Sequence, residues 1–125
     1  MNNREIKFRI WDTIDEKFET LLLQPTDTIG TGFIHFYPIR KIFQQFIGLK
    51  DDLGQDIYEG DIVKYSVNYT HEHGDKDIQK FIGEVKYDAT FAMYVFGANE
   101  HSMYDRIDKI EVMGNIFENA DLINK

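Results

Sequence analysis

Apolar and polar residues alternate with a period of two along most of this chain, which is the pattern of β-strands with one buried face. Helical spacing is scarce by comparison. The strands that the alternation predicts span residues 6–11, 17–23, 33–37, 43–47, 63–69, 81–88, 91–96 and 110–116. Because residues 87–91 have the composition of a tight turn, we expect the strands on either side of them to pair as an antiparallel hairpin.

Loops and helices fill the remaining stretches. Residues 24–32 and 70–79 are polar or rich in Gly and Pro, which predicts loops. Helix is expected in a brief turn at 103–107 and in one C-terminal turn, for which Asn119 is a good N-cap. Short strands with glycine-bearing turns between them favour a small, strongly bent barrel.

We therefore predict a mainly β fold in one small domain over residues 1–125, with N-terminal short strands, a bent SH3-like β-barrel-type sheet and a short C-terminal helical turn. The domain could comprise two sub-layers, 1–47 and 48–125. A fold of this class does not by itself indicate a function.

Two acidic, glycine-bearing turns lie in the tract from Gly48 to Val63. Its first turn, residues 51–56, superficially resembles a calcium loop, but it lacks the alternating ligands and the terminal bidentate Glu of an EF-hand. Turn formation explains the composition better, because Asp and Gly tolerate the backbone angles that turns require, and Gly54 is expected to take a positive φ.

Three segments together resemble the YopX-like family of bacteriophage and prophage proteins: Arg4 to Asp12, Gly48 to Val63, and Glu111 to Asn119. They occur in the family's order and span nearly the whole chain. The resemblance implies an origin in a phage or prophage of a bacterium and a protein that could form a homo-oligomer. It supplies no catalytic residues.

Composition narrows the classes of protein further. The chain has 125 residues, of which 42% are hydrophobic and 14% aromatic, so we expect it to fold. The absence of cysteine excludes disulfides, thiolate metal sites and cysteine nucleophiles. The start of the chain lacks the apolar region of a secretory signal, and the longest apolar run, 91–96, falls far short of the roughly 20 residues of a membrane span. We therefore expect a cytoplasmic protein of the bacterial host that has no membrane partner.

Charge is unevenly distributed. The formal net charge is −8: residues 1–50 carry seven Lys and Arg against six Asp and Glu (+1), whereas residues 51–125 carry seven against sixteen (−9). Because nucleic-acid binding depends on basic side chains, this balance makes nucleic acid an improbable partner. Solubility is the simpler explanation, and the alternative is an acidic decoy of a host protein that binds nucleic acid.

Candidate catalytic and ligand-binding residues are few. His71 and His73 lie two residues apart beside carboxylates, as a metal site could require, but no further His or Cys cluster completes a zinc site. Ser66 and Ser102 lie in no nucleophile motif, and no phosphate loop is present. We expect no metal, no cofactor and no catalytic residues, and hence no enzyme, although a site without a motif would escape this reasoning.

The roles of two groups of side chains, one basic and one aromatic, are left open by the sequence. Lys7, Arg9 and Trp11 are expected on the outer face of the first strand, near Arg4, where they would form either a solvated face or a stripe that contacts nucleic acid. The seven tyrosines and ten phenylalanines exceed what a small barrel core obviously needs, so either some lie at an interface or all pack in the core. The tyrosines are Tyr37, Tyr58, Tyr65, Tyr69, Tyr87, Tyr94 and Tyr104. The leading hypothesis is a phage accessory protein that binds itself and an unidentified phage or host protein.

The histidine pair gives the first testable prediction. If residues 71–75 form an incidental loop, adding zinc leaves the midpoint of thermal unfolding unchanged, because a ligand stabilises a fold only when it binds the native state. Thermal melts followed by circular dichroism, with and without zinc, measure this. A midpoint that rises with zinc concentration would show instead that the loop is a metal site.

Overall fold

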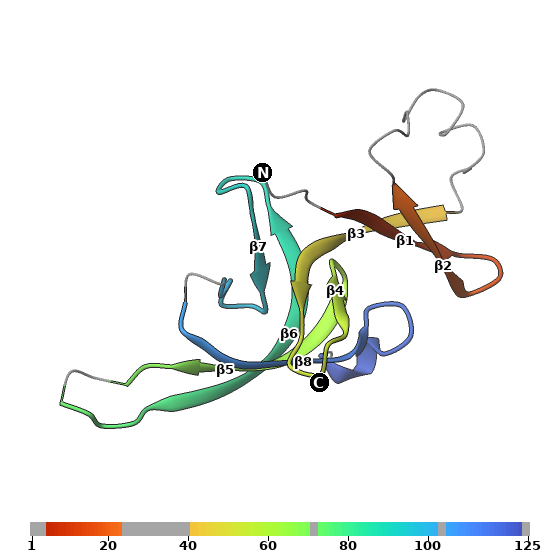
Figure 1. Cartoon of the computed structure of the whole chain (residues 1–125). Coiled ribbons are helices and arrows are strands. Elements are labelled where there is room, and N and C mark those ends of the chain that lie inside the picture. Colours follow the sequence, from red (N-terminus) through yellow and green to blue (C-terminus); the bar gives the residue numbers. More distant parts are fainter. Residues whose placement is uncertain (1–4, 24–40, 71–72, 103–104, 124–125) are drawn as a thin grey trace.

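The structure is a computed structural model that describes residues 5–23, 41–70, 73–102 and 105–123. Eight strands and one short helix account for most of this part of the chain (Figure 1). In order they are β1 (Ile6–Asp12), β2 (Lys17–Leu23), β3 (Lys41–Lys50), β4 (Asp56–Tyr58), β5 (Asp61–Asn68), β6 (Ile78–Asp88), β7 (Met93–Phe96), β8 (Ile107–Asn115) and the 3-10 helix η1 (Ala120–Leu122). The mainly β fold predicted from the sequence is confirmed.

The strands form two antiparallel sheets. The first has the order β2-β1-β3-β4 and the second the order β7-β6-β5-β8. β5 lies at the centre of the second sheet and pairs with β6 on one side and β8 on the other. The chain passes from one sheet to the other at the turn between β4 and β5, and the long β5–β6 hairpin extends away from the first sheet (Figure 1).

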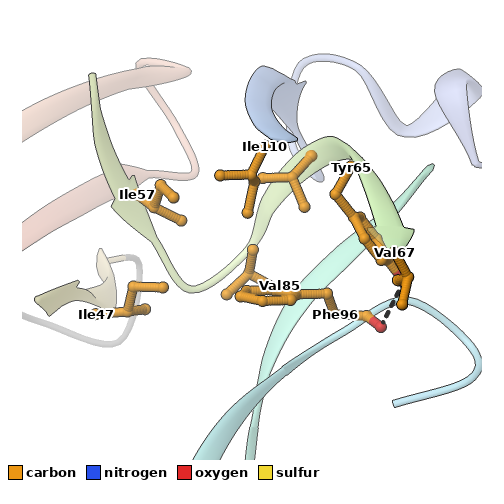
Figure 2. Close-up of a cluster of buried hydrophobic side chains, with 8 residues drawn as sticks. Ile47, Ile57, Tyr65, Val67, Val85, Phe96 and Ile110 are labelled. Carbon is orange, nitrogen blue, oxygen red and sulfur yellow. Dashed lines mark hydrogen bonds between the residues drawn. The ribbon is translucent and has the colours of Figure 1, made fainter. Parts of the chain in front are cut away.

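The main core lies where the two sheets meet. Ile47 of β3 and Ile57 of β4 contribute from the first sheet to a cluster that is otherwise built by the second sheet (Figure 2). The buried members of this cluster are Ile47, Ile57, Val63, Tyr65, Val67, Val85, Phe96 and Ile110. Because both sheets supply side chains to this cluster, their association contributes to the hydrophobic stabilisation of the fold.

A smaller aromatic cluster fastens the C-terminal segment to the first sheet. Phe117, which follows β8, stacks on Trp11 of β1 with ring centroids 4.9 Å apart and an interplanar angle of 2°. Phe18 of β2 packs against Trp11 at 4.8 Å. Such aromatic pairs add to the stabilisation from burial alone. The chain thus returns after β8 to cover a face of β1.

This return explains why one sequence-based prediction is wrong. The neighbours Ile10 and Trp11 are only 1% and 7% exposed, although successive strand residues point to opposite faces. β1 is therefore buried on both faces at this end, and Lys7 and Arg9 lie half-buried rather than in solvent. The stripe proposed as a solvated or nucleic-acid-binding face is covered by β5 and the C-terminal segment.

Several element boundaries also differ from the predictions. β6 begins at Ile78, inside the predicted loop at 70–79, and β4 was not predicted. Asp105 and Arg106 are not helical and Ile107 begins β8, so the described part of the 103–107 stretch does not form the expected helical turn. The predicted strand at 33–37 and the predicted loop at 24–32 lie outside the described residues. The C-terminal turn is present, but Asn119 does not cap it with its side chain.

Close backbone packing occurs where β6 passes the residue after β7. A Cβ atom on Gly83 would lie 2.3 Å from the Cα of Gly97, closer than a carbon atom can approach. Gly97 N–H donates to the Glu84 carbonyl at 3.0 Å, which holds the two segments together. Only glycine at position 83 permits this approach.

We expect Gly83→Ala to lower the free energy of unfolding by about 1–3 kcal/mol, because the added methyl group forces the backbones apart. Urea denaturation measures the change. Gly54→Ala is the matched control. Gly54 has φ +85° but open space around its Cβ position, so we expect this variant to lower the free energy of unfolding by only about 1 kcal/mol, through backbone strain. If Gly83→Ala lowers the free energy of unfolding no more than Gly54→Ala does, the two backbones separate easily and the prediction is wrong.

Candidate functional site

The turn Glu59-Gly60 joins the two sheets, and a cluster of polar side chains surrounds it. Gly60 has φ +85°, and a Cβ atom there would lie 2.0 Å from Nε2 of Gln44. Its N–H donates to the Val85 carbonyl at 2.8 Å, and its carbonyl accepts from Ile116 N–H at 2.9 Å. The position therefore requires glycine for two reasons, and the turn binds both β6 and the C-terminal segment.

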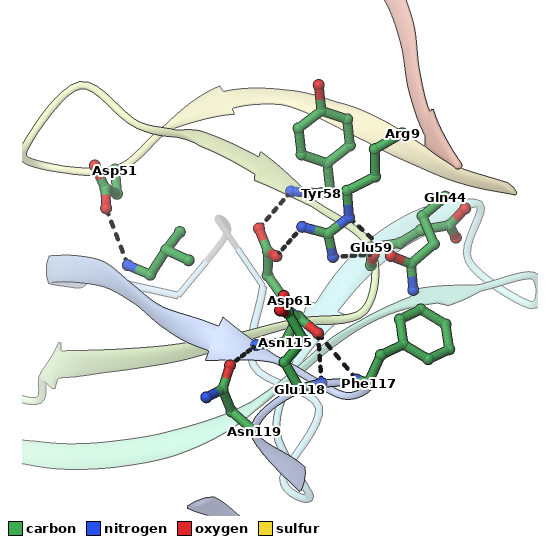
Figure 3. Close-up of polar contacts among 11 residues, drawn as sticks. Arg9, Gln44, Asp51, Tyr58, Glu59, Asp61, Asn115, Phe117, Glu118 and Asn119 are labelled. Carbon is green, nitrogen blue, oxygen red and sulfur yellow. Dashed lines mark hydrogen bonds and ion pairs between the residues drawn. The ribbon is translucent and has the colours of Figure 1, made fainter. Parts of the chain in front are cut away.

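A buried ion pair lies directly beside this turn. Arg9 Nη1 is 2.5 Å from Asp61 Oδ1, and the two side chains are only 12% and 2% exposed (Figure 3). Arg9 Nε donates to Gln44 Oε1 at 2.8 Å, and Tyr58 N–H donates to Asp61 Oδ2 at 2.8 Å. Burial raises the pKa of Asp61 above its usual value, and this effect outweighs the neighbouring Arg9 charge. The pair ties β1 of the first sheet to β5 of the second.

Three lysines of the first sheet are also paired, whereas Lys17 at the start of β2 is exposed and has no ion pair among the described residues. Lys7 binds Asp56, which Lys50 contacts from its other side at 2.6 Å. Lys41 lies 2.7 Å from the fully buried carboxylate of Asp12. These bonds use the charges of Lys7 and Arg9 that a nucleic-acid strand would need, and Arg4 of the predicted stripe lies outside the described residues.

Two carboxylates of the acidic turn accept backbone N–H groups. Asp51 Oδ1 accepts from Leu53 and Gln55, and its Oδ2 accepts from Val112 of β8 at 2.9 Å. Asp52 both donates to and accepts from Ile110 of β8, each at 3.0 Å. The turn thus occupies the outer edge of β8, which a sheet must protect from other strands. Its carboxylates serve the turn and the edge, as turn formation predicted.

The Asp51 carboxylate is a stabilising group. Burial disfavours its charged form, but the backbone N–H groups of Val112, Gln55 and Leu53 outweigh that effect and hold the pKa of Asp51 below its usual value. A lowered pKa in the folded state means that this stabilisation is present above the pKa of an unfolded Asp and is lost as pH falls through the folded value.

In the C-terminal motif around Asn115, side-chain oxygens also accept backbone N–H groups and stabilise a turn. Asn115 Oδ1 accepts from the N–H groups of Phe117 and Glu118, at 3.0 and 2.9 Å (Figure 3). Asn119 Oδ1 accepts from Asn115 N–H at 3.2 Å, which is why it does not cap η1. A side chain on Gly114 would collide with Asn119. This motif closes the turn that carries Phe117 onto Trp11.

His101 forms a buried cluster that sequence reasoning missed. It is 7% exposed and lies between two tyrosines: Tyr65 Oη is 2.8 Å from Nδ1 and Tyr69 Oη is 3.1 Å from Nε2. Because Tyr65 donates its proton to the Phe96 carbonyl at 3.0 Å, its oxygen accepts from Nδ1–H, and Nε2 accepts from Tyr69. Burial raises the pKa of Tyr65 to about 12, so it stays protonated. The imidazole nitrogens of His101 and the hydroxyls of Tyr65 and Tyr69 thus all take part in hydrogen bonds within the fold.

The histidine pair at 71 and 73, a candidate metal site by sequence, is only half within the described residues. His71 lies outside the described residues and His73 is exposed. Within residues 5–23, 41–70, 73–102 and 105–123, no three side chains of the types His, Asp and Glu converge as a metal site requires. Nor does a helix in these ranges have the length and apolarity to cross a membrane.

Among the described residues, the β6–β7 hairpin carries the most exposed aromatic side chains. Phe91 is 69% exposed and Tyr87 is 51% exposed, and the ring of Tyr87 meets that of Tyr94 edge-on, with centroids 5.3 Å apart. A hollow of about 540 Å³ lies between this hairpin and the first sheet. Its lining residues are Gln45, Ile47, Glu59, Tyr87, Ala92 and Tyr94. We call Tyr87, Phe91, Tyr94 and this hollow the hairpin surface.

A comparison of the sequence with protein families bears on identity. The family model described as YopX protein matches residues 12–124. The chain belongs to the YopX family. No curated protein matches it. The segments that carry the resemblance to this family contain the turn at Gly60, the carboxylates of Asp51 and Asp52 that bind the edge of β8, and the Asn115 motif. All three stabilise the fold.

One solved structure supports the YopX fold. It is described as the crystal structure of protein EF1440 from Enterococcus faecalis, with 21% sequence identity and a TM-score of 0.58. The match covers 94% of this chain and 96% of that one. Similarity at this level of identity concerns the fold, and it extends over nearly the full length of both chains.

We expect Asp51→Asn to lower the free energy of unfolding at neutral pH by about 1–3 kcal/mol, because the amide NH₂ would face the Val112 N–H donor. The difference from the wild type should shrink as pH falls below the usual range of Asp, where Asp51 itself becomes protonated. Urea denaturation at several pH values tests both points. Asp108→Asn, on an exposed position of β8, is the control and should change little.

Proposed function

We propose that this YopX protein is a phage or prophage accessory protein that acts in the bacterial cytoplasm by binding proteins, through the hairpin surface, and that it is not an enzyme. Its partners are a second copy of itself and a phage or host protein. The observation that carries the proposal is the exposure of Phe91 and Tyr87 on a hairpin at the edge of the second sheet.

The distribution of polar contacts supports binding over catalysis. The clusters that resemble catalytic constellations in composition, around Asp61, Asp51 and His101, are each occupied by bonds within the fold. An acid–base catalyst needs a titratable group within hydrogen-bond reach of a substrate proton. The buried members of these clusters are instead directed at backbone or side-chain partners.

The aromatic content supports the hairpin as the binding surface. Tyr58 and Tyr65 are buried in the core, whereas Tyr87 and Phe91 lie more than half exposed. Tyr and Phe are enriched in the centres of protein interfaces, where they bury large areas. The hollow beside Tyr94 offers a cavity into which a side chain of a partner could insert.

Self-association is favoured by the position of β7. In the described part of the chain β7 pairs with β6 alone, apart from a single bridge between Phe96 and His101, so it forms an edge of the sheet. Edge strands present backbone groups to which another strand can add. A second copy placed against β7 would cover this edge and the exposed aromatic rings together.

The proposal predicts that the double variant Tyr87→Ser with Phe91→Ser loses self-association. Sedimentation equilibrium of the full chain over a range of concentrations should show a dimer or larger assembly for the wild type and a monomer for the variant. Leu53→Ser is the matched control, because Leu53 is 78% exposed but lies on the turn beside β8. It should leave association unchanged.

Partner capture tests the same surface. Lysate of the bacterial host, treated with nuclease, should yield a protein that the wild type and Leu53→Ser retain and the double variant does not. The proposal fails if the wild type is monomeric and captures nothing that depends on the hairpin. Turnover of any substrate by the wild type would contradict the exclusion of catalysis.

A further inference from the structure

The outer face of the second sheet contains a hydroxyl group for which the fold offers no bond. Ser66 of β5 is 6% exposed, and its Oγ has no hydrogen-bond partner among the described residues. Buried polar groups in native proteins are nearly always satisfied, and an exception calls for an explanation such as a ligand. Ser66 is also among the residues that line a hollow of about 290 Å³, and its hydroxyl is covered beside that space.

The sheet register surrounds this hydroxyl with ammonium groups. Ser66 lies directly opposite Lys80 of β6 and directly opposite Lys109 of β8. Lys64, two residues earlier on β5, points to the same face. Side chains directly opposite on neighbouring strands have Cβ atoms about 5 Å apart. Lysines from three adjacent strands therefore converge around one serine, and Figure 1 shows these three strands side by side.

The three lysines differ from the paired cations of the first sheet, although Lys64 lies directly opposite Glu111 of β8 in the register. Lys7, Arg9, Lys41 and Lys50 of the first sheet all form ion pairs, but Lys64, Lys80 and Lys109 have no ion pair with any described residue. The hollow is lined by these three lysines, by Asp52 and Glu111, and by uncharged residues, which gives it a net charge of +1 in a chain of −8. The Asp52 carboxylate is already bound to Ile110 N–H.

The chemistry of this lining matches a phosphate group. Lysine ammonium groups bind phosphate as point charges, and a serine hydroxyl donates a hydrogen bond to an anionic oxygen. Lysine stems are flexible, so Lys80 and Lys109, which lie opposite Ser66, can adjust their ammonium groups to an anion bound at the hydroxyl. The hollow also has an apolar wall at Leu53, which is 78% exposed.

Size and charge restrict the ligand further. A volume of about 290 Å³ lies at the lower end of small-molecule sites. A nucleic-acid strand would extend beyond the hollow over a region, residues 51–125, whose net charge of −9 repels it. We propose that the row Lys80–Ser66–Lys109, with Lys64, is a binding site for a small phosphorylated molecule. This site is separate from the hairpin surface and does not depend on it.

The test is a titration of the full-length chain followed by amide NMR. Inorganic phosphate and adenosine 5′-monophosphate should give saturable shifts at Ser66, Lys80 and Lys109, whereas adenosine and acetate should not. The nucleotide binding more tightly than inorganic phosphate would place an organic group against Leu53. Equal affinities would identify free phosphate as the ligand.

Variants separate this site from adventitious attraction. Lys80→Gln with Lys109→Gln should weaken binding by about tenfold or more, because each removes a charged contact. Ser66→Ala should weaken binding several-fold without lowering the midpoint of thermal unfolding, since the hydroxyl has no partner to lose. Lys86→Gln is the matched control: it removes the same charge from an exposed position on β6 and should change nothing.

Three results would overturn the proposal. They are the absence of saturable shifts with both phosphate probes, equal binding of acetate, and equal weakening by Lys86→Gln. Ser66→Ala with unchanged affinity would also overturn it, because the hydroxyl would then be only a packing defect. Loss of self-association in the hairpin variant leaves this test unaffected, so the two proposals fail independently.

Discussion

The buried ion pair between Arg9 and Asp61 is the contact on which the arrangement of the two sheets depends. Arg9 belongs to β1 and Asp61 begins β5, and neither sheet contains both residues. Burial of the carboxylate is costly, as the raised pKa of Asp61 shows, and removing one partner of such a pair leaves an uncompensated charge that typically costs about 3–5 kcal/mol. Arg9 also lies over the rings of Phe18 and Tyr58, at 4.6 and 5.0 Å, so the pair is embedded in aromatic packing. The turn at Gly60 then delivers the chain from one sheet to the other at this point.

Around that junction, the side chains of Asp and Asn residues accept backbone N–H groups that no neighbouring strand pairs with. Asp51 and Asp52 bind the edge of β8, and Asn115 closes the turn that follows it. Some of the acidic residues thus stabilise turns and the outer edge of β8. Two surfaces remain outside this structural use, the aromatic hairpin and the lysine row around Ser66, and they lie on different parts of the second sheet. That separation is what lets the two proposed roles, binding of a protein and binding of a small ligand, be tested independently.

Much of the fold was predictable from local pattern, and the failures have specific causes. The hairpin predicted from strands at 81–88 and 91–96 follows from alternation and turn composition and is confirmed, but its strands span Ile78–Asp88 and Met93–Phe96, and residues 91 and 92 belong to the turn. β4 was missed because three residues are too few to show a period. β3 was predicted short because Gly48, with φ +92°, interrupts the alternation although the strand continues to Lys50. The outer face of β1 was assigned to solvent because alternation indicates which residues share a face but does not reveal that a second layer covers it. Of the candidate site residues, none could be chosen by sequence, because the surroundings of each depend on distant strands.

The sequence by itself determined the β class, the positions of the acidic turns and membership of the YopX family, because these depend on periodicity and on residues close together in the chain. Only the tertiary structure decided that Phe117 covers Trp11, that His101 lies between Tyr65 and Tyr69, and that Lys80 and Lys109 flank Ser66. These contacts join residues 14 to 106 positions apart, as the separations of Ser66 from Lys80 and of Trp11 from Phe117 show. Strand register sets the Ser66 neighbours, and a shift of one residue would move these side chains to the opposite face, whereas the path of the chain beyond β7 and β8 sets the contacts of His101 and Phe117.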